Sequence, residues 1–110
     1  MKIHQWEVWK ATPPGFSKAH WFIIVTGQER LDSNRVAVNG LACYTLYTLR
    51  GHPEKTDVRL NGADGFSAPT VCPCDHLFVL DKNALIETLG PVSWERQQQI
   101  KSKLKEVFRF

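Results

Sequence analysis

The sequence has no long uncharged apolar run of the kind that spans a bilayer. Met1–His4 does not open a signal-peptide pattern either. A chain of 110 residues has room for one hydrophobic core, and its 43% apolar content is enough to fill one. We therefore expect a single domain over residues 1–110 in a soluble, cytoplasmic protein.

Cysteine is scarce, and its spacing does not match the common metal sites or disulfide scaffolds. Cys72 and Cys74 enclose a single proline, which is tighter than the C-x₂₋₄-C spacing of zinc sites, and no second pair follows them. Cys43 stands alone. Three is also an odd number, so we expect free thiols in a reducing compartment, with no metal and no cofactor.

Neither sign of charge is in large excess, but the small excess that exists is unevenly placed. Residues 1–92 contain nine Lys or Arg and nine Asp or Glu, so the net charge of +3 comes from residues 93–110. A basic C-terminal helix can attract nucleic acid or an acidic partner. The alternative is an ordinary solvated helix face.

The most apolar stretch, Trp21–Thr26, contains only aromatic and β-branched residues. This composition is typical of a strand that is buried on both faces. A polar loop precedes it and ends in Lys18 and His20. Rigid strands often present functional groups on the loops that they hold, so we take this entrance as the centre of a candidate site.

Alternating and apolar patterns predict several further strands. Asn39–Gly40 marks either a hairpin turn or a bend within one strand. Pro73 places its strand at a sheet edge or at a bulge. The predicted strands are Ile3–Lys10, Ala19–Thr26, Arg35–Leu49, Asp57–Leu60, Ser67–Val71 and His76–Asp81.

The sequence predicts only one long helix, at the C-terminus. Ser93 is its expected N-cap, and its apolar residues form one stripe at i, i+4, i+7 and i+8, namely Ile100, Leu104, Val107 and Phe108. Asp81 is expected to cap a short helical turn, and Gly27–Asn34 to be a surface connection. The fold class is therefore mainly β with a C-terminal α-helix, a small curled β-barrel.

The order of these elements resembles the MazF/PemK family of bacterial toxins over nearly the whole chain. The family opens with an aromatic-Val strand, then a Pro/Gly loop, a basic residue, Arg-Pro and a Val/Ile run. Later it has a Ser-Val-Val passage with Asp, a Val-Asp-Lys signature, and Leu-Gly-apolar-Ser before its terminal helix. The matching stretches are Gln5–Trp9, Lys18–Thr26, Gly65–Val71, Cys74–Leu77, Val79–Lys82 and Leu89–Ser93.

The resemblance implies an SH3-like barrel that forms a homodimer and cleaves single-stranded RNA without a metal. It also implies a cognate antitoxin protein whose acidic or apolar tail blocks the RNA groove. The site departs from the family pattern: His20 stands in the place of the motif Arg, and Trp21 in the place of the Pro. Gly40–Cys43 falls where the family has Pro-x-Thr-Ser, and a short gap would place Thr45 there.

Metal-free RNA cleavage needs a base, an acid and a cation. His20 is the candidate acid or base because its unperturbed pKa lies near neutrality. Lys18 would carry transition-state charge, and Thr45 would position the phosphate or the 2′-hydroxyl. The alternatives are a surface histidine, a solvated lysine and a plain strand threonine.

The substrate-binding candidates are aromatic, cationic or thiol side chains near the same groove. Aromatic rings stack on bases, and cations contact phosphates. For these residues the alternatives are core packing or a solvated loop. The candidates are Trp21, Cys43, Tyr44, Arg50, His52 and Lys55.

Besides a small barrel of unknown role, three interpretations of function follow from the altered motif. The first is a toxin-like endoribonuclease. The second is a catalytically degenerate relative that binds RNA or a protein partner without cutting. The third keeps the fold but poisons a protein target, as the related gyrase inhibitors do.

Overall fold

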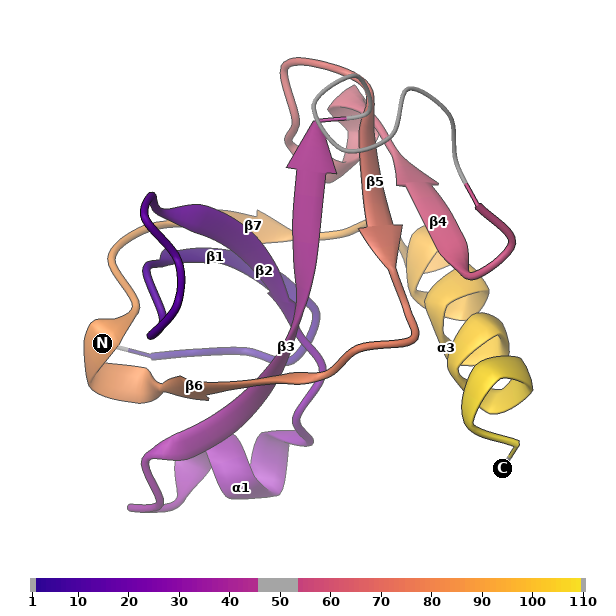
Figure 1. Ribbon diagram of the computed structural model, residues 1–110. Coiled ribbons are helices and arrows are strands. Elements are labelled where there is room, and N and C mark those ends of the chain that lie inside the picture. Colours follow the sequence, from indigo (N-terminus) through magenta and orange to yellow (C-terminus); the bar gives the residue numbers. More distant parts are fainter. Residues whose placement is uncertain (1, 46–53, 110) are drawn as a thin grey trace.

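The computed structural model describes residues 2–45 and 54–109. Seven strands form one antiparallel sheet in the order β4-β5-β3-β2-β1-β7, and β6 pairs with β3 beside that path. The sheet curls into a half-open barrel, and α3 packs beside β4 (Figure 1). The strands are β1 Glu7–Ala11, β2 His20–Ile24, β3 Ala37–Thr45, β4 Asp57–Leu60, β5 Thr70–Pro73, β6 Phe78–Asp81 and β7 Thr88–Pro91. The helices are α1 Gln28–Asp32, η1 Gly62–Asp64, η2 Lys82–Ala84 and α3 Trp94–Phe108.

The fold class expected from the sequence is confirmed, and β2 lies at its centre. β2 pairs with β1 on one side and with β3 on the other. Phe22, Ile23 and Ile24 are fully buried. Successive side chains point to opposite faces, so Ile23 enters a core cluster with Ile100 of α3, whereas Phe22 and Ile24 enter a second cluster on the other face. The prediction that this strand is buried on both faces is correct.

The first strand begins later than its alternation suggests. Trp6 has a positive φ of 74°, which interrupts an extended strand, and β1 starts at Glu7. The Trp6 backbone is held by the Ile24 carbonyl and by the Val92 amide. Trp9 is buried within this strand. β1 therefore contributes side chains to both core clusters.

Asn39–Gly40 lies within β3 and does not form a hairpin turn. A Cβ at Gly40 would approach the Leu80 Cδ1 atom to 2.8 Å and the Phe22 Cβ atom to 3.1 Å. Glycine is needed here because β3 passes close to side chains from β2 and β6. This close approach allows β3 to pair with both neighbours at once.

Two other expectations are corrected by the structure, and one further strand was not predicted. Gly27–Asn34 contains α1, whose Leu31 packs into the core. β5 lies between β3 and β4 and is therefore not an edge strand. Pro73 is tolerated because it occupies the last position of β5, where a missing N–H does least harm. Thr88–Pro91 forms β7, which no alternating pattern in the sequence predicted.

In the described part of the chain, no helix combines the length and the apolar character needed to cross a membrane.

Candidate active site

The start of β2 and the end of β3 lie side by side, which places the central candidates in one region. Trp21 pairs with Cys43 in the antiparallel register, and His20 and Tyr44 follow at the adjacent positions. His20 is held where β2 begins because the Pro13–Gly15 loop cannot continue a β-ladder. The site is therefore built from two rigid strand ends.

The strand pleat divides the predicted site residues between two faces. His20 and Tyr44 share one face, and their ring centroids are 5.4 Å apart in an edge-to-face arrangement. Trp21, Cys43 and Thr45 point to the other face, because side chains alternate along a strand. That face has a small hollow of about 120 Å³, lined by Trp21, Cys43, Thr45, Phe66, Ser67, Ala68 and Thr70. Tyr44, which lies between Cys43 and Thr45 in β3, also contributes atoms to its lining. His20 and Thr45, which the sequence suggested as partners, are thus on opposite sides of the sheet.

The contacts of His20 define which ring nitrogen is open. Its Nδ1 atom lies 3.1 Å from the carbonyl oxygen of Lys18. A carbonyl only accepts hydrogen bonds, so in the neutral ring Nδ1 carries the proton and Nε2 is the acceptor. Phe16 packs its ring edge against the half-buried imidazole at a centroid distance of 4.9 Å. The arrangement presents Nε2 as the basic atom of this ring.

Tyr44 presents a phenol ring on the same face as this imidazole. Burial raises the pKa of Tyr44 above its usual 10.0, and the neighbouring Cys43 and Cys72 thiols act in the same direction. The phenol therefore keeps its proton at neutral pH. A protonated phenol can donate a hydrogen bond to a phosphate oxygen.

Three other candidates have identifiable surroundings. Trp21 is half-buried, and the Lys10 Nζ atom lies 5.5 Å from its ring centroid. Cys43 is buried in the core, where its Sγ lies 3.8 Å from the Leu41 carbonyl oxygen. Lys18 is exposed in the loop before β2. Lys55 is exposed in the turn before β4, and Arg50 and His52 lie outside the described residues.

The structure adds aromatic residues that the motifs did not indicate. Phe16 contacts His20, Phe22 and Phe78, and His76 stacks on Phe78. In the sequence, His76 and Phe78 lie two apart in the predicted strand His76–Asp81, and such residues share a face of a strand, although β6 itself begins only at Phe78. Among the residues with described positions, no group of three or more His, Cys, Asp or Glu side chains could hold a metal ion.

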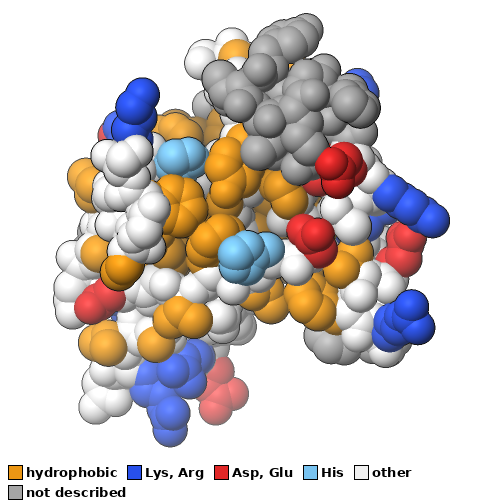
Figure 2. All heavy atoms as spheres, viewed as in Figure 1, with side chains coloured by type: hydrophobic (Ala, Val, Ile, Leu, Met, Phe, Trp, Pro, Cys, Tyr) orange, Lys and Arg blue, Asp and Glu red, His pale blue; other side chains and the backbone are white. Residues whose placement is uncertain are grey.

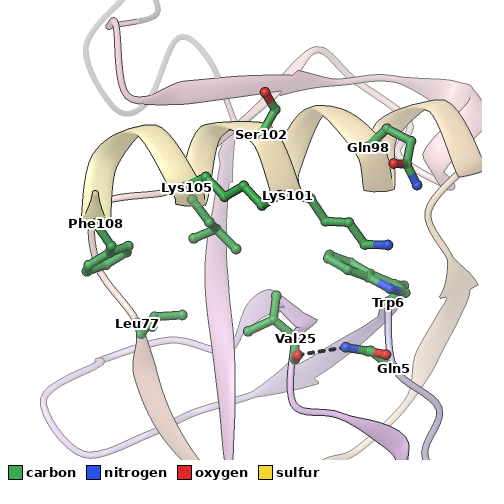
Figure 3. A pocket seen from close by; sticks show the side chains of 10 residues that line it. Gln5, Trp6, Val25, Leu77, Gln98, Lys101, Ser102, Lys105 and Phe108 are labelled. Carbon is green, nitrogen blue, oxygen red and sulfur yellow. Dashed lines mark hydrogen bonds between the residues drawn. The ribbon is translucent and has the colours of Figure 1, made fainter. Parts of the chain in front are cut away.

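A second and larger hollow lies under α3, about 540 Å³ in volume. Figure 3 shows Leu77 and Phe108 at one end and Trp6 at the other. The Lys101 Nζ atom lies 5.8 Å from the Trp6 ring centroid, and Lys105 also lines the hollow. This groove therefore combines an apolar floor with cationic side chains from the helix.

Scans of the sequence against family models and against curated proteins give no match. Solved structures, in contrast, match the fold over nearly its whole length. The fold is that of the MazF toxin endoribonucleases, which confirms the architecture expected from the resemblance. All the similarities that carry this statement are structural, with sequence identities below 20%.

Three of these structures illustrate the match. An endoribonuclease from a mycobacterial species, solved in complex with its cognate antitoxin, has a TM-score of 0.80 and 18% identity, with 99% of this chain and 95% of that chain covered. Mycobacterium tuberculosis toxin MazF-mt6 has a TM-score of 0.78 and 19% identity, with 94% and 97% covered. A MazE–MazF structure from Deinococcus radiodurans has a TM-score of 0.75 and 14% identity, with 98% and 96% covered.

Proposed function

We propose that this chain is a divergent MazF-like toxin that cleaves single-stranded RNA in the cytoplasm without a metal. The observation that carries the proposal is the pairing of His20 with Tyr44 on one face of the sheet, 5.4 Å apart between ring centroids, within a fold shared with toxin endoribonucleases. This arrangement supports the proposal because an imidazole, which can act as a base, and a phenol, which can donate a hydrogen bond, lie on one face of the sheet.

The chemistry is an attack of the ribose 2′-hydroxyl on the adjacent phosphorus. His20 Nε2 accepts the hydroxyl proton, the new P–O bond forms, and the bond to the 5′-oxygen breaks with return of a proton to that oxygen. The Tyr44 hydroxyl donates to a phosphate oxygen as negative charge develops. Tyr44 takes the part assigned above to Thr45, because it shares the face of His20. Lys18, whose carbonyl orients His20, supplies positive charge at the same entrance.

The proposal is tested with a long mixed-sequence RNA in EDTA. His20→Ala should lower the cleavage rate at least 100-fold, because general acid–base catalysis contributes about 10²–10⁴. Tyr44→Phe keeps the ring and removes only the hydroxyl, so its loss should be smaller. His4→Ala is the matched control: His4 is an exposed histidine that contacts Glu7, and its loss should leave cleavage unchanged.

Intact RNA with folded wild-type protein would contradict the endoribonuclease proposal. Retarded RNA migration without fragments would then indicate the degenerate binding protein. Growth arrest with intact RNA would indicate a protein target.

We also propose that the chain forms a homodimer and binds a cognate antitoxin. The structural neighbours from mycobacteria and Deinococcus include toxin–antitoxin complexes. The groove under α3, with an apolar floor and Lys101 and Lys105 beside it, suits an acidic segment with apolar side chains. Light scattering tests the homodimer, since the monomer has a mass of 12.6 kDa. A monomeric mass at micromolar concentration would contradict the homodimer.

A further inference from the structure

A continuous row of rings leads from His20 to a second histidine. Phe16 lies 4.9 Å from His20 and 5.4 Å from Phe78, and Phe78 lies 4.0 Å from His76, all between ring centroids. The row joins the loop before β2 to the start of β6. On the face drawn in Figure 2, two histidine side chains lie among hydrophobic side chains. The row therefore extends the candidate active site along one surface.

The geometry of the last contact differs from the others. Phe16 meets His20 and Phe78 edge to face, with interplanar angles of 71°. His76 instead lies nearly parallel to Phe78, with an interplanar angle of 27°. Phe78 is half-buried and packs against the fully buried Phe22, whereas His76 is exposed. One face of the imidazole is thus fixed on a rigid ring, and its other face is open.

A flat ring held in this way suits one kind of ligand. Nucleobases stack on aromatic faces whatever their sequence, because every base has a π-face. A phosphate is less suited to this position, since it has no flat face that can stack on the ring. The orientation of His76 is set before binding, which reduces the entropy lost when a base stacks on it.

We propose that His76, supported by Phe78, is a nucleobase-stacking subsite for single-stranded RNA next to the His20 site. This proposal rests on the proposed function, which supplies the RNA. It assigns His76 a role in binding and in positioning the strand, with no part in proton transfer.

The test uses a fluorescent 2′-O-methyl oligonucleotide of mixed sequence, which has no 2′-hydroxyl proton and cannot be cut. His76→Ala should weaken binding about tenfold, which equals about 1.4 kcal/mol. His76→Phe should bind like the wild type, because it keeps a flat ring. His76→Lys should bind no better than His76→Ala, because it keeps charge but lacks a ring. His4→Ala is the control and should leave the affinity unchanged.

A second measurement places the base itself. One abasic nucleotide, moved along the oligonucleotide, should weaken wild-type binding most at a single position, and at that position it should not weaken His76→Ala further. Equal binding by the wild type and His76→Ala would overturn the subsite. So would recovery by His76→Lys without recovery by His76→Phe, which would indicate a phosphate contact, and so would a wild type that binds no oligonucleotide.

These outcomes are separable from failure of the proposed function. A wild type that binds the oligonucleotide through His76 but leaves ordinary RNA intact would keep the subsite and remove the nuclease. If the wild type and His76→Ala cut RNA equally well at limiting RNA concentration, the nuclease proposal stands and the subsite proposal fails.

Discussion

At the scale of single residues, Asp64 shows how a charged side chain can hold this fold together. Its side chain is fully buried. One carboxylate oxygen accepts from the Ser93 amide at 3.2 Å, and the other accepts from the Asn61 amide at 3.1 Å and from the Arg96 Nε at 3.0 Å. Asp64 therefore connects η1 to the first turn of α3. A buried carboxylate is tolerated here because each oxygen has a donor.

Asp64→Ala should lower the free energy of unfolding by about 3–5 kcal/mol, because it leaves Arg96 without its buried partner and the Asn61 and Ser93 amides without their acceptor. Asp81→Ala is the control, since Asp81 is an exposed cap that accepts from the Asn83 amide at 2.8 Å and should cost only about 1 kcal/mol. Urea unfolding of both variants measures the difference. Equal costs would show that the Asp64 cluster adds no more than a surface cap.

At the scale of secondary-structure elements, Lys82 fastens α1 to the end of β6. Its Nζ atom lies 2.8 Å from the Leu31 carbonyl oxygen, 2.9 Å from that of Ser33 and 3.3 Å from that of Arg30. The last carbonyls of a helix have no partner within the helix and carry partial negative charge. The Asp81–Lys82 pair, which belongs to the family-like stretch Val79–Lys82, thus has a structural role: Asp81 caps η2, and the Lys82 ammonium donates to the last carbonyls of α1.

Lys82→Met should lower the free energy of unfolding by about 1–2 kcal/mol, since it removes three hydrogen bonds from a charged donor that is partly exposed. Lys10→Met is the matched control. Lys10 pairs with Glu87 at 3.3 Å where both side chains are exposed, so its loss should cost between about 0 and 1 kcal/mol. Thermal unfolding of the two variants compares them, and a smaller loss for Lys82 than for Lys10 would contradict its capping role.

At the scale of the whole molecule, the buried thiols link stability to pH. Cys72 and Cys74 are fully buried. The hydrogen bond with the Cys43 thiol, together with burial, raises the pKa of Cys72 well above its usual 9.0. The hydrogen bond with Cys72, together with burial, raises the pKa of Cys74 as well. Both thiols therefore stay protonated in the folded chain at pH values where the unfolded chain ionises.

The sign of the pH dependence follows from proton binding. Well below pH 9 both states keep these protons, so the thiols add no slope. Above that pH the unfolded chain binds fewer protons than the folded chain, so the free energy of unfolding should fall by about 1.4 kcal/mol per pH unit for each thiol. Urea unfolding between pH 8 and 10.5 measures the slope, and a variant with Cys72→Ala and Cys74→Ala should have a smaller one. An unchanged slope would assign the alkaline loss to other groups.

Much of this architecture could be predicted from the sequence, because it depends on residues that lie close together along the chain. The composition of Trp21–Thr26 predicted the central strand, and the side chain of Ser93 predicted the start of α3, where its Oγ accepts from the Arg96 amide at 3.2 Å. Side-chain alternation and helix capping involve residues a few positions apart, so a sequence displays them directly. β7 was missed because its strand character comes from pairing with β1, more than 70 residues away along the chain.

Tertiary structure alone decided which groups meet at the candidate site. The register of β2 against β3 places Tyr44, and not Thr45, beside His20, and a shift of one residue would have reversed the two faces. Folding of the loop before β2 over the sheet brings Phe16 between His20 and Phe78. Such contacts join segments that are distant in sequence, and their geometry is set by packing. The sequence by itself therefore determined most of the elements and the resemblance, because these depend on neighbouring residues, while the three-dimensional pairing determined which groups meet at the candidate site.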